Sequence, residues 1–170
     1  MFSKKSMSVQ TALVLSAFLS VSAAKADTQC YTAASLKGTY AVVATYGANV
    51  ALALALRHFD GSGNLTGTFT LNEPTPGSST GARTIVTGTN VGTYTVNCDG
   101  TGVITRTVTA SNGTVAHQMD DFVITKARVI EDGQLIATAL EDAQRTPSAI
   151  VPGGIFLIRS YTRLPDSQSE

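Results

Sequence analysis

The sequence has little basic charge, few metal-binding side chains and a single long apolar run, and each shortage excludes a class of function. Only 12 of the 170 residues are lysine or arginine, and they are scattered, so no basic stripe is available for a nucleic-acid backbone. Paired metal-ligand motifs, a G-x-S-x-G elbow and a phosphate-binding loop are all missing. We therefore predict no nucleic-acid partner, no metal site and no cofactor.

The apolar run belongs to a predicted secretory signal peptide at residues 1–26. Lysines at positions 4 and 5 precede the run over residues 9–21, and the small residues Ala24 and Ala26 suit signal peptidase. The run is shorter than the roughly 20 residues that cross a bilayer, so we expect no stable membrane anchor. Cleavage leaves 144 residues with nine basic and twelve acidic side chains, in a secreted or periplasmic location.

Cys30 and Cys98 are the only cysteines in the sequence. An even count in an oxidising compartment predicts a disulfide between them. This bridge would close a long loop and attach the N-terminal segment to the rim of a barrel.

From Gly38 onward, the sequence is rich in Thr, Val, Ile, Tyr and Gly, with turn signals at short intervals, as is typical of antiparallel β-structure. Over residues 65–71, apolar side chains alternate with threonines, which gives a strand one apolar and one hydroxylated face. We expect the strand from 114 to 130 to carry a bend or bulge near residues 119–121. The other expected strands span 38–46, 50–59, 65–71, 83–89, 92–98, 102–110, 134–141 and 154–163.

These strands predict an all-β fold, a single antiparallel β-barrel of about eight strands at residues 27–164. An immunoglobulin-like or pilin-like sandwich is the alternative, and residues 165–170 are expected to be a disordered tail. Alanine and leucine alternate over residues 51–56 and are strong helix formers, but leucines two apart share a face only on a strand. The stripe of Leu52, Leu54 and Leu56 then faces the interior, or covers an interface if it points outward, so an oligomer is possible.

Three segments, LKGTY at 36–40, HFDGSGNLTG at 58–67 and GTYTVNC at 92–98, stand in an order that resembles a group of small secreted bacterial proteins. These proteins are assigned a lipocalin-like or allene-oxide-cyclase-like β-barrel, and most have no known activity. The resemblance covers nearly the whole mature chain and implies the barrel. Allene oxide cyclases bind an apolar fatty-acid epoxide inside the barrel, but no catalytic position can be matched here, so the catalytic residues are unknown.

Two groups of polar residues are weak candidates for chemistry. Asp60, Ser62 and Asn64 alternate as the first calcium ligands of an EF-hand loop do. Leu65 and Leu71, however, stand where that loop has its glycine and its glutamate, which favours a hairpin turn. His117 lies near Asp120 and Asp121, a set that could bind a metal or transfer protons. On a regular strand, however, His117 and Asp121 share one face while Asp120 points away, which favours a solvated edge. His58 is expected at the rim.

Three functions remain open: binding of a small apolar ligand, cyclisation or isomerisation of such a ligand, and a structural role in the cell envelope with a filled barrel. Binding leads, and whether the protein is an enzyme is left uncertain. We expect the ligand to enter at the rim that carries residues 72–82, with Tyr40 and Tyr94 as polar handles. Because the sequence is poor in paired ionisable groups, apolar burial is the expected main source of affinity.

Overall fold

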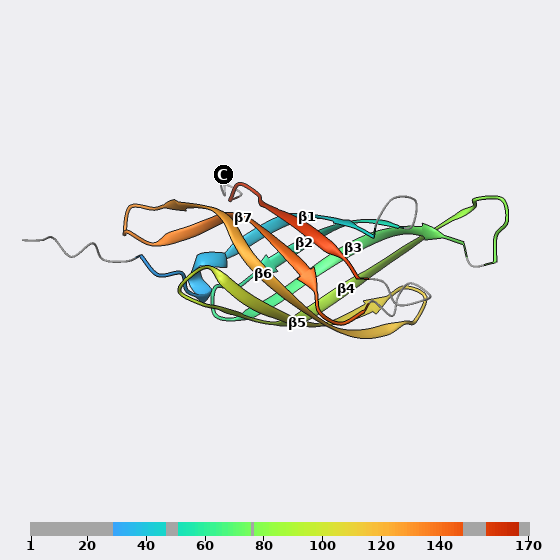
Figure 1. Ribbon diagram of the computed structural model, residues 1–170, viewed down its shortest axis with the longest axis horizontal. Coiled ribbons are helices and arrows are strands. Elements are labelled where there is room, and N and C mark those ends of the chain that lie inside the picture. Colours follow the sequence, from blue (N-terminus) through green and yellow to red (C-terminus); the bar gives the residue numbers. More distant parts are fainter. Residues whose placement is uncertain (1–28, 47–50, 76, 148–155, 167–170) are drawn as a thin grey trace, which may run out of the picture.

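The computed structural model describes residues 29–46, 51–75, 77–147 and 156–166, and these form a closed antiparallel barrel of eight strands (Figure 1). Each strand pairs with its neighbours in the sequence, and the last pairs with the first. The predicted signal peptide and residues 167–170 lie outside the described residues. The elements are the 3-10 helix η1 (Ala33–Leu36) and strands β1 (Gly38–Thr45), β2 (Leu52–Phe59), β3 (Asn64–Pro74), β4 (Arg83–Val96), β5 (Thr101–Ala110), β6 (Val115–Val129), β7 (Leu135–Gln144) and β8 (Ile158–Arg163).

The predicted all-β barrel is confirmed, with two differences in the strands. Residues 83–89 and 92–98 were expected as separate strands, but β4 runs unbroken from Arg83 to Val96. Gly92 marks a close approach instead of a turn, because a Cβ there would lie 2.1 Å from the carbonyl oxygen of Thr105. The bulge predicted near residues 119–121 is wrong in position: the register shifts between Ile124 and Lys126.

The half of the barrel next to η1 is filled by side chains. Phe59 lies at the centre of this core, with its ring edge-on to those of Tyr40 and Tyr94 at centroid distances of 5.4 and 5.0 Å. The residues packed around these rings include Leu36, Val42, Leu65, Ile104, Phe122, Ala137, Leu140 and Tyr161. Among the described residues, these buried side chains fill this half of the interior, as side chains can in a barrel of eight strands.

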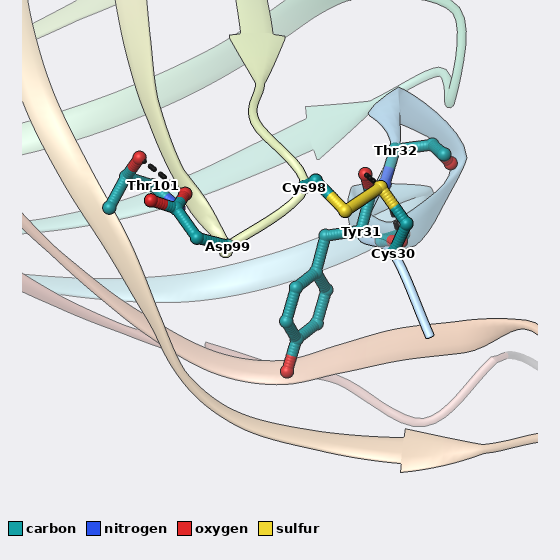
Figure 2. Close-up of a disulfide and its surroundings, with 7 residues drawn as sticks. Cys30, Tyr31, Thr32, Cys98, Asp99 and Thr101 are labelled. Carbon is teal, nitrogen blue, oxygen red and sulfur yellow. Dashed lines mark hydrogen bonds between the residues drawn. A yellow bond between two sulfur atoms is a disulfide. The ribbon is translucent and has the colours of Figure 1, made fainter. Parts of the chain in front are cut away.

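The disulfide between Cys30 and Cys98 is present, as the sequence predicted. Figure 2 shows it at the start of the described chain, where it joins the segment before η1 to the residues that follow β4. The backbone N–H of Tyr31 also donates to the carbonyl oxygen of Cys98 at 3.2 Å. The N-terminal segment is therefore attached to the barrel rim by a covalent bond and a hydrogen bond.

The alternating segment at residues 51–56 forms the start of β2, and its leucines point outward. Leu52, Leu54 and Leu56 are 58, 65 and 49 % exposed, so the first of the two predicted directions, toward the interior, is not observed. The alternate positions Ala53 and Ala55 line the interior. Among the described residues, no helix is long and apolar enough to cross a membrane.

Candidate ligand-binding site

A cavity occupies the half of the barrel away from η1, toward the β3–β4 hairpin. The cavity volume is about 40 Å³, and the cavity opens to solvent. Its wall is apolar and its floor is polar. The wall consists of Val42, Ala44, Tyr46, Ala53, Ala55, Phe69, Val108 and Leu157, and the floor of Arg57, Asn90, Arg106, Gln118 and Arg159.

The alanines of the wall explain why a cavity remains in this half of the barrel, which also holds a smaller apolar cluster of Ala51, Leu71, Val86 and Ala110. Ala44, Ala53 and Ala55 stand on β1 and β2 at inward positions, where the opposite half of the barrel carries Tyr40 and Phe59. Side chains alternate between the two faces of a strand, so one small residue at every second position opens the interior without disturbing the outer face. The alternation that turns the leucines of β2 outward therefore also places small residues around the cavity.

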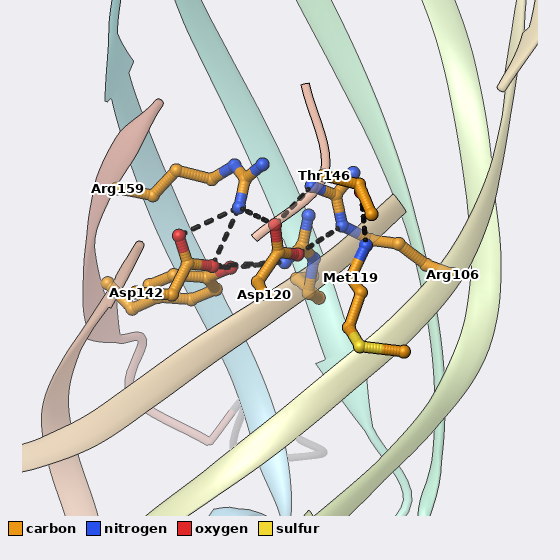
Figure 3. Close-up of polar contacts among 8 residues, drawn as sticks. Arg106, Met119, Asp120, Asp142, Thr146 and Arg159 are labelled. Carbon is orange, nitrogen blue, oxygen red and sulfur yellow. Dashed lines mark hydrogen bonds and ion pairs between the residues drawn. The ribbon is translucent and has the colours of Figure 1, made fainter. Parts of the chain in front are cut away.

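Beneath the cavity lies a buried charged cluster, made of Arg57, Arg106, Asp120, Asp142 and Arg159. Arg106 binds Asp120 through Nε and Nη2, at 2.9 and 3.3 Å. Nη1 of Arg159 lies 3.0 Å from Asp120 Oδ1 and donates to both oxygens of Asp142 at 2.7 and 2.8 Å. Arg159 thus bridges the two carboxylates, as Figure 3 shows.

Tyr161 connects the third arginine to this cluster. Its hydroxyl donates to Oδ2 of Asp142 and accepts a hydrogen bond from Nη1 of Arg57. The Arg57 guanidinium also lies 5.2 Å from the centre of the Tyr161 ring, in a cation–π arrangement. Its Nη1 is 3.9 Å from Oδ2 of Asp142, so this arginine is only weakly paired with a carboxylate. Burial raises the pKa of Tyr161, which therefore stays a neutral hydroxyl at physiological pH.

The charges of the cluster do not balance. Among the described residues it sets three guanidinium groups against two carboxylates, which leaves one positive charge in excess. Burial, together with the positive charges of Arg159 and Arg57, lowers the pKa of Arg106 to about 10, and this arginine remains protonated at neutral pH. Burial alone would raise the pKa of Asp120, but Arg159 and Arg106 outweigh it and hold that pKa below its usual value.

Two N–H groups of the cluster have no hydrogen-bond partner in the part of the chain that the structure describes: Nε of Arg57 and Nη2 of Arg159. Both residues line the cavity and are 2 and 4 % exposed. In Figure 3 the free terminal nitrogen of Arg159 points away from both carboxylates. Buried donors without acceptors are rare in proteins, and an unfilled ligand position is one explanation of such a group.

Tyr40 and Tyr94, the predicted polar handles, lie in the filled half of the barrel and do not line the cavity. The hydroxyl of Tyr40 donates to the carbonyl oxygen of Ala137 at 2.9 Å, and that of Tyr94 donates to Ala33 at 3.0 Å. Burial raises the pKa of Tyr40 to about 12. Both hydroxyls tie strands and η1 together, and a role in ligand binding stays a prediction.

The other candidate groups are placed as the face argument predicted. His117 is exposed and lies 3.1 Å from the hydroxyl of Thr107, Asp121 pairs with Arg145, and Asp120 points into the barrel. His58 is exposed near the end of β2. In the hairpin turn, Oδ1 of Asp60 accepts from two backbone N–H groups. The described residues contain no group of three or more His, Cys, Asp and Glu side chains able to hold a metal ion.

The charged cluster was missed by the sequence reasoning, and the expectation that the chain is poor in paired ionisable groups is wrong for the interior. The signal was present in the alternation. Arg106 stands two residues from Ile104 and from Val108, and therefore shares their inward face. Asp142 stands two residues after the buried Leu140 in the same way.

The depressed pKa of Asp120 predicts that the protein loses stability in acid. A carboxylate whose folded pKa lies below its unfolded value, about 3.9, stabilises the fold above that value, and this contribution is lost as the pH falls through the folded pKa. Urea unfolding should therefore show a lower midpoint at pH near 3 than at pH near 6. Equal midpoints would contradict the prediction.

Two surface carboxylates serve as the control for this acid effect. Hydrogen bonds from Asn64 lower the pKa of Asp60 to about 2, and hydrogen bonds from Thr101 lower that of Asp99. The double variant Asp60→Asn, Asp99→Asn removes both surface contributions. The acid loss that remains in this variant then reports on the buried cluster.

Comparisons with protein-family models, with curated proteins and with solved structures gave no match. The closed, eight-stranded, all-β architecture agrees with a lipocalin-like fold, whereas the finer allene-oxide-cyclase-like assignment stays a prediction. The function is therefore inferred from the cavity and the charged cluster beneath it.

Proposed function

We propose that this protein binds a small molecule with an apolar body inside the barrel. The observation that supports this proposal is the cavity, whose apolar wall stands where alanines replace the large side chains of the filled half. The interior of an eight-stranded barrel is either filled by side chains or holds one small ligand. In this barrel, side chains fill the half next to η1, and the cavity lies in the other half. The cavity volume is about 40 Å³, below that of a typical small-molecule site, so the ligand would fill the cavity and extend into its open mouth.

The wall also supplies the affinity that such a ligand needs. Burial of apolar surface contributes about 25 cal/mol per Å², and the wall presents aliphatic and aromatic side chains for it. We place the entrance on the side of the β3–β4 hairpin, residues 75–82, because the cavity lies in that half of the barrel and η1 covers the other end. The lipocalin-like resemblance supports binding over a purely structural role.

Filling the cavity should weaken binding without unfolding the protein. The neutral fluorescent probe N-phenyl-1-naphthylamine is titrated into the mature chain and into Ala55→Leu, whose side chain would extend from the wall into the space above Arg57. We expect the wild type to bind the probe at micromolar concentration. Ala55→Leu should lose at least roughly tenfold in affinity, because the added side chain occupies the space that the probe needs.

The matched control is Ala143→Leu, which adds the same side chain at an exposed position of β7. It should bind the probe as the wild type does. A second control, Leu54→Thr, removes an exposed leucine of β2 and detects binding of the probe to the outer face. If Ala55→Leu binds normally, or if Leu54→Thr alone abolishes binding, the cavity is not the binding site.

A further inference from the structure

We propose that the ligand carries one carboxylate group, which Arg57 and Arg159 bind on the floor of the cavity while the apolar body lies against the wall. This inference rests on the proposed function, because it names the chemistry of a ligand for the same cavity. It follows from the charge of the cluster, from its unpartnered N–H groups and from the position of both beneath an apolar wall.

The charge of the cluster matches a single negative charge. Among the described residues, Arg57, Arg106 and Arg159 face only Asp120 and Asp142, and all five side chains are almost fully buried. A buried charge without a counterion is unfavourable, so a monoanion entering the cavity would neutralise the excess. A phosphate monoester carries nearly two negative charges at neutral pH and would reverse the imbalance.

The free donors match the two oxygens of a carboxylate. Nε of Arg57 and Nη2 of Arg159 lack an acceptor among the described residues, and both side chains line the cavity. A carboxylate offers two acceptor oxygens and forms its strongest hydrogen bonds with guanidinium groups. One oxygen would accept from each arginine, and the ligand would remove two unsatisfied buried donors at once.

Both arginines are held in position before a ligand arrives. Nη1 of Arg57 donates to the Tyr161 hydroxyl, and Nη1 of Arg159 donates to Asp142. A planar guanidinium whose one nitrogen is fixed in this way keeps its other N–H groups in a fixed direction. Such preorganisation lowers the entropy lost on binding and favours a ligand group of one particular shape.

Isothermal titration calorimetry at neutral pH tests the inference with three ligands that share one alkyl chain: octanoate, 1-octanol and octylamine. We expect octanoate to bind roughly tenfold or more tightly than octanol, the difference that a hydrogen bond to a charged group makes. Octylamine, which is cationic, should bind more weakly than octanol. Octyl phosphate should bind more weakly than octanoate.

The variant Arg57→Met removes one free donor and the excess charge, so its affinity for octanoate should fall to that for octanol. Arg57→Lys keeps the charge without the Nε donor and should show an intermediate preference; it replaces the first variant if circular dichroism shows that Arg57→Met is unfolded. The control Arg145→Met removes an exposed arginine, 53 % accessible, and should leave the preference unchanged.

The neutral naphthylamine probe separates the two proposals. If the probe binds but octanol and octanoate bind equally well, or if Arg57→Met keeps the preference for octanoate, the carboxylate inference is wrong and the binding proposal stands. If neither the probe nor any octyl compound binds the wild type, the binding proposal itself is wrong.

Discussion

Replacing Arg159 with methionine is expected to lower the free energy of unfolding by about 3–5 kcal/mol, the usual effect of removing one partner of a buried ion pair. Arg159 is 4 % exposed and bridges Asp120 and Asp142, so its loss removes a close cation from both carboxylates and leaves Asp142 with Arg57, at 3.9 Å, as its only cation among the described residues. A typical domain has only about 5–15 kcal/mol of stability in total. Urea unfolding monitored by circular dichroism measures the change.

The same substitution at Arg145 is the matched control. Arg145 also pairs with an aspartate, Asp121, but the two side chains are 53 and 52 % exposed. An exposed pair contributes about 0–1 kcal/mol, so Arg145→Met should unfold close to the wild type. Arg159→Lys keeps a positive charge without the bridging geometry and should lie between the two. If Arg159→Met and Arg145→Met lower the free energy of unfolding by similar amounts, burial does not determine how much the cluster contributes to stability.

Removal of the disulfide, by replacing Cys30 and Cys98 with serine, should cost on the order of 4 kcal/mol. The two cysteines are 68 residues apart in the sequence, so the bridge closes a long loop in the unfolded chain. Its main effect is therefore expected on the unfolded state. Urea unfolding of the wild type with and without dithiothreitol should show the same loss as the double serine variant. Equal midpoints with and without reductant would contradict this account.

Probe binding is the control that shows whether removal of the disulfide changes only the stability of the protein. The bridge lies beside η1, whereas the cavity lies in the opposite half of the barrel, toward the β3–β4 hairpin. Under conditions where the serine variant is folded, we expect it to bind the naphthylamine probe with wild-type affinity. A weaker probe affinity in the folded variant would show that the two ends of the barrel are coupled.

The barrel could be predicted from the sequence because the turn residues of its hairpins are recognisable in the local sequence. In the turn at residues 60–64, the carboxylate of Asp60 accepts hydrogen bonds from the backbone N–H groups of Ser62 and Asn64, a common role of aspartate in turns. The direction of the leucines in β2 could not be decided in the same way. Alanine and leucine are both apolar, so period-two alternation shows that the two sets face opposite ways without showing which set is inside.

The charged cluster was harder to predict because its members come from five different strands. They are Arg57 from β2, Arg106 from β5, Asp120 from β6, Asp142 from β7 and Arg159 from β8. Barrel closure brings residues that are far apart in the sequence into this cluster, and local sequence patterns do not reveal that closure. Each charged residue, read alone, is most often a surface residue. Only the register of neighbouring strands places Arg106 opposite Gln118 and beside Asp120.

The strand that closes the barrel also completes the charged cluster. β8 follows every other strand in the sequence, and it joins the open edges of β1 and β7. It also brings Arg159 and Tyr161, the hydrogen-bond donors of Asp142. Before β8 docks, the sheet has two unpaired edges and an interior carboxylate without these donors. Closing the barrel and supplying the hydrogen-bond donors of Asp142 are therefore the same event, so a barrel that is not closed holds an interior carboxylate without Arg159 and Tyr161.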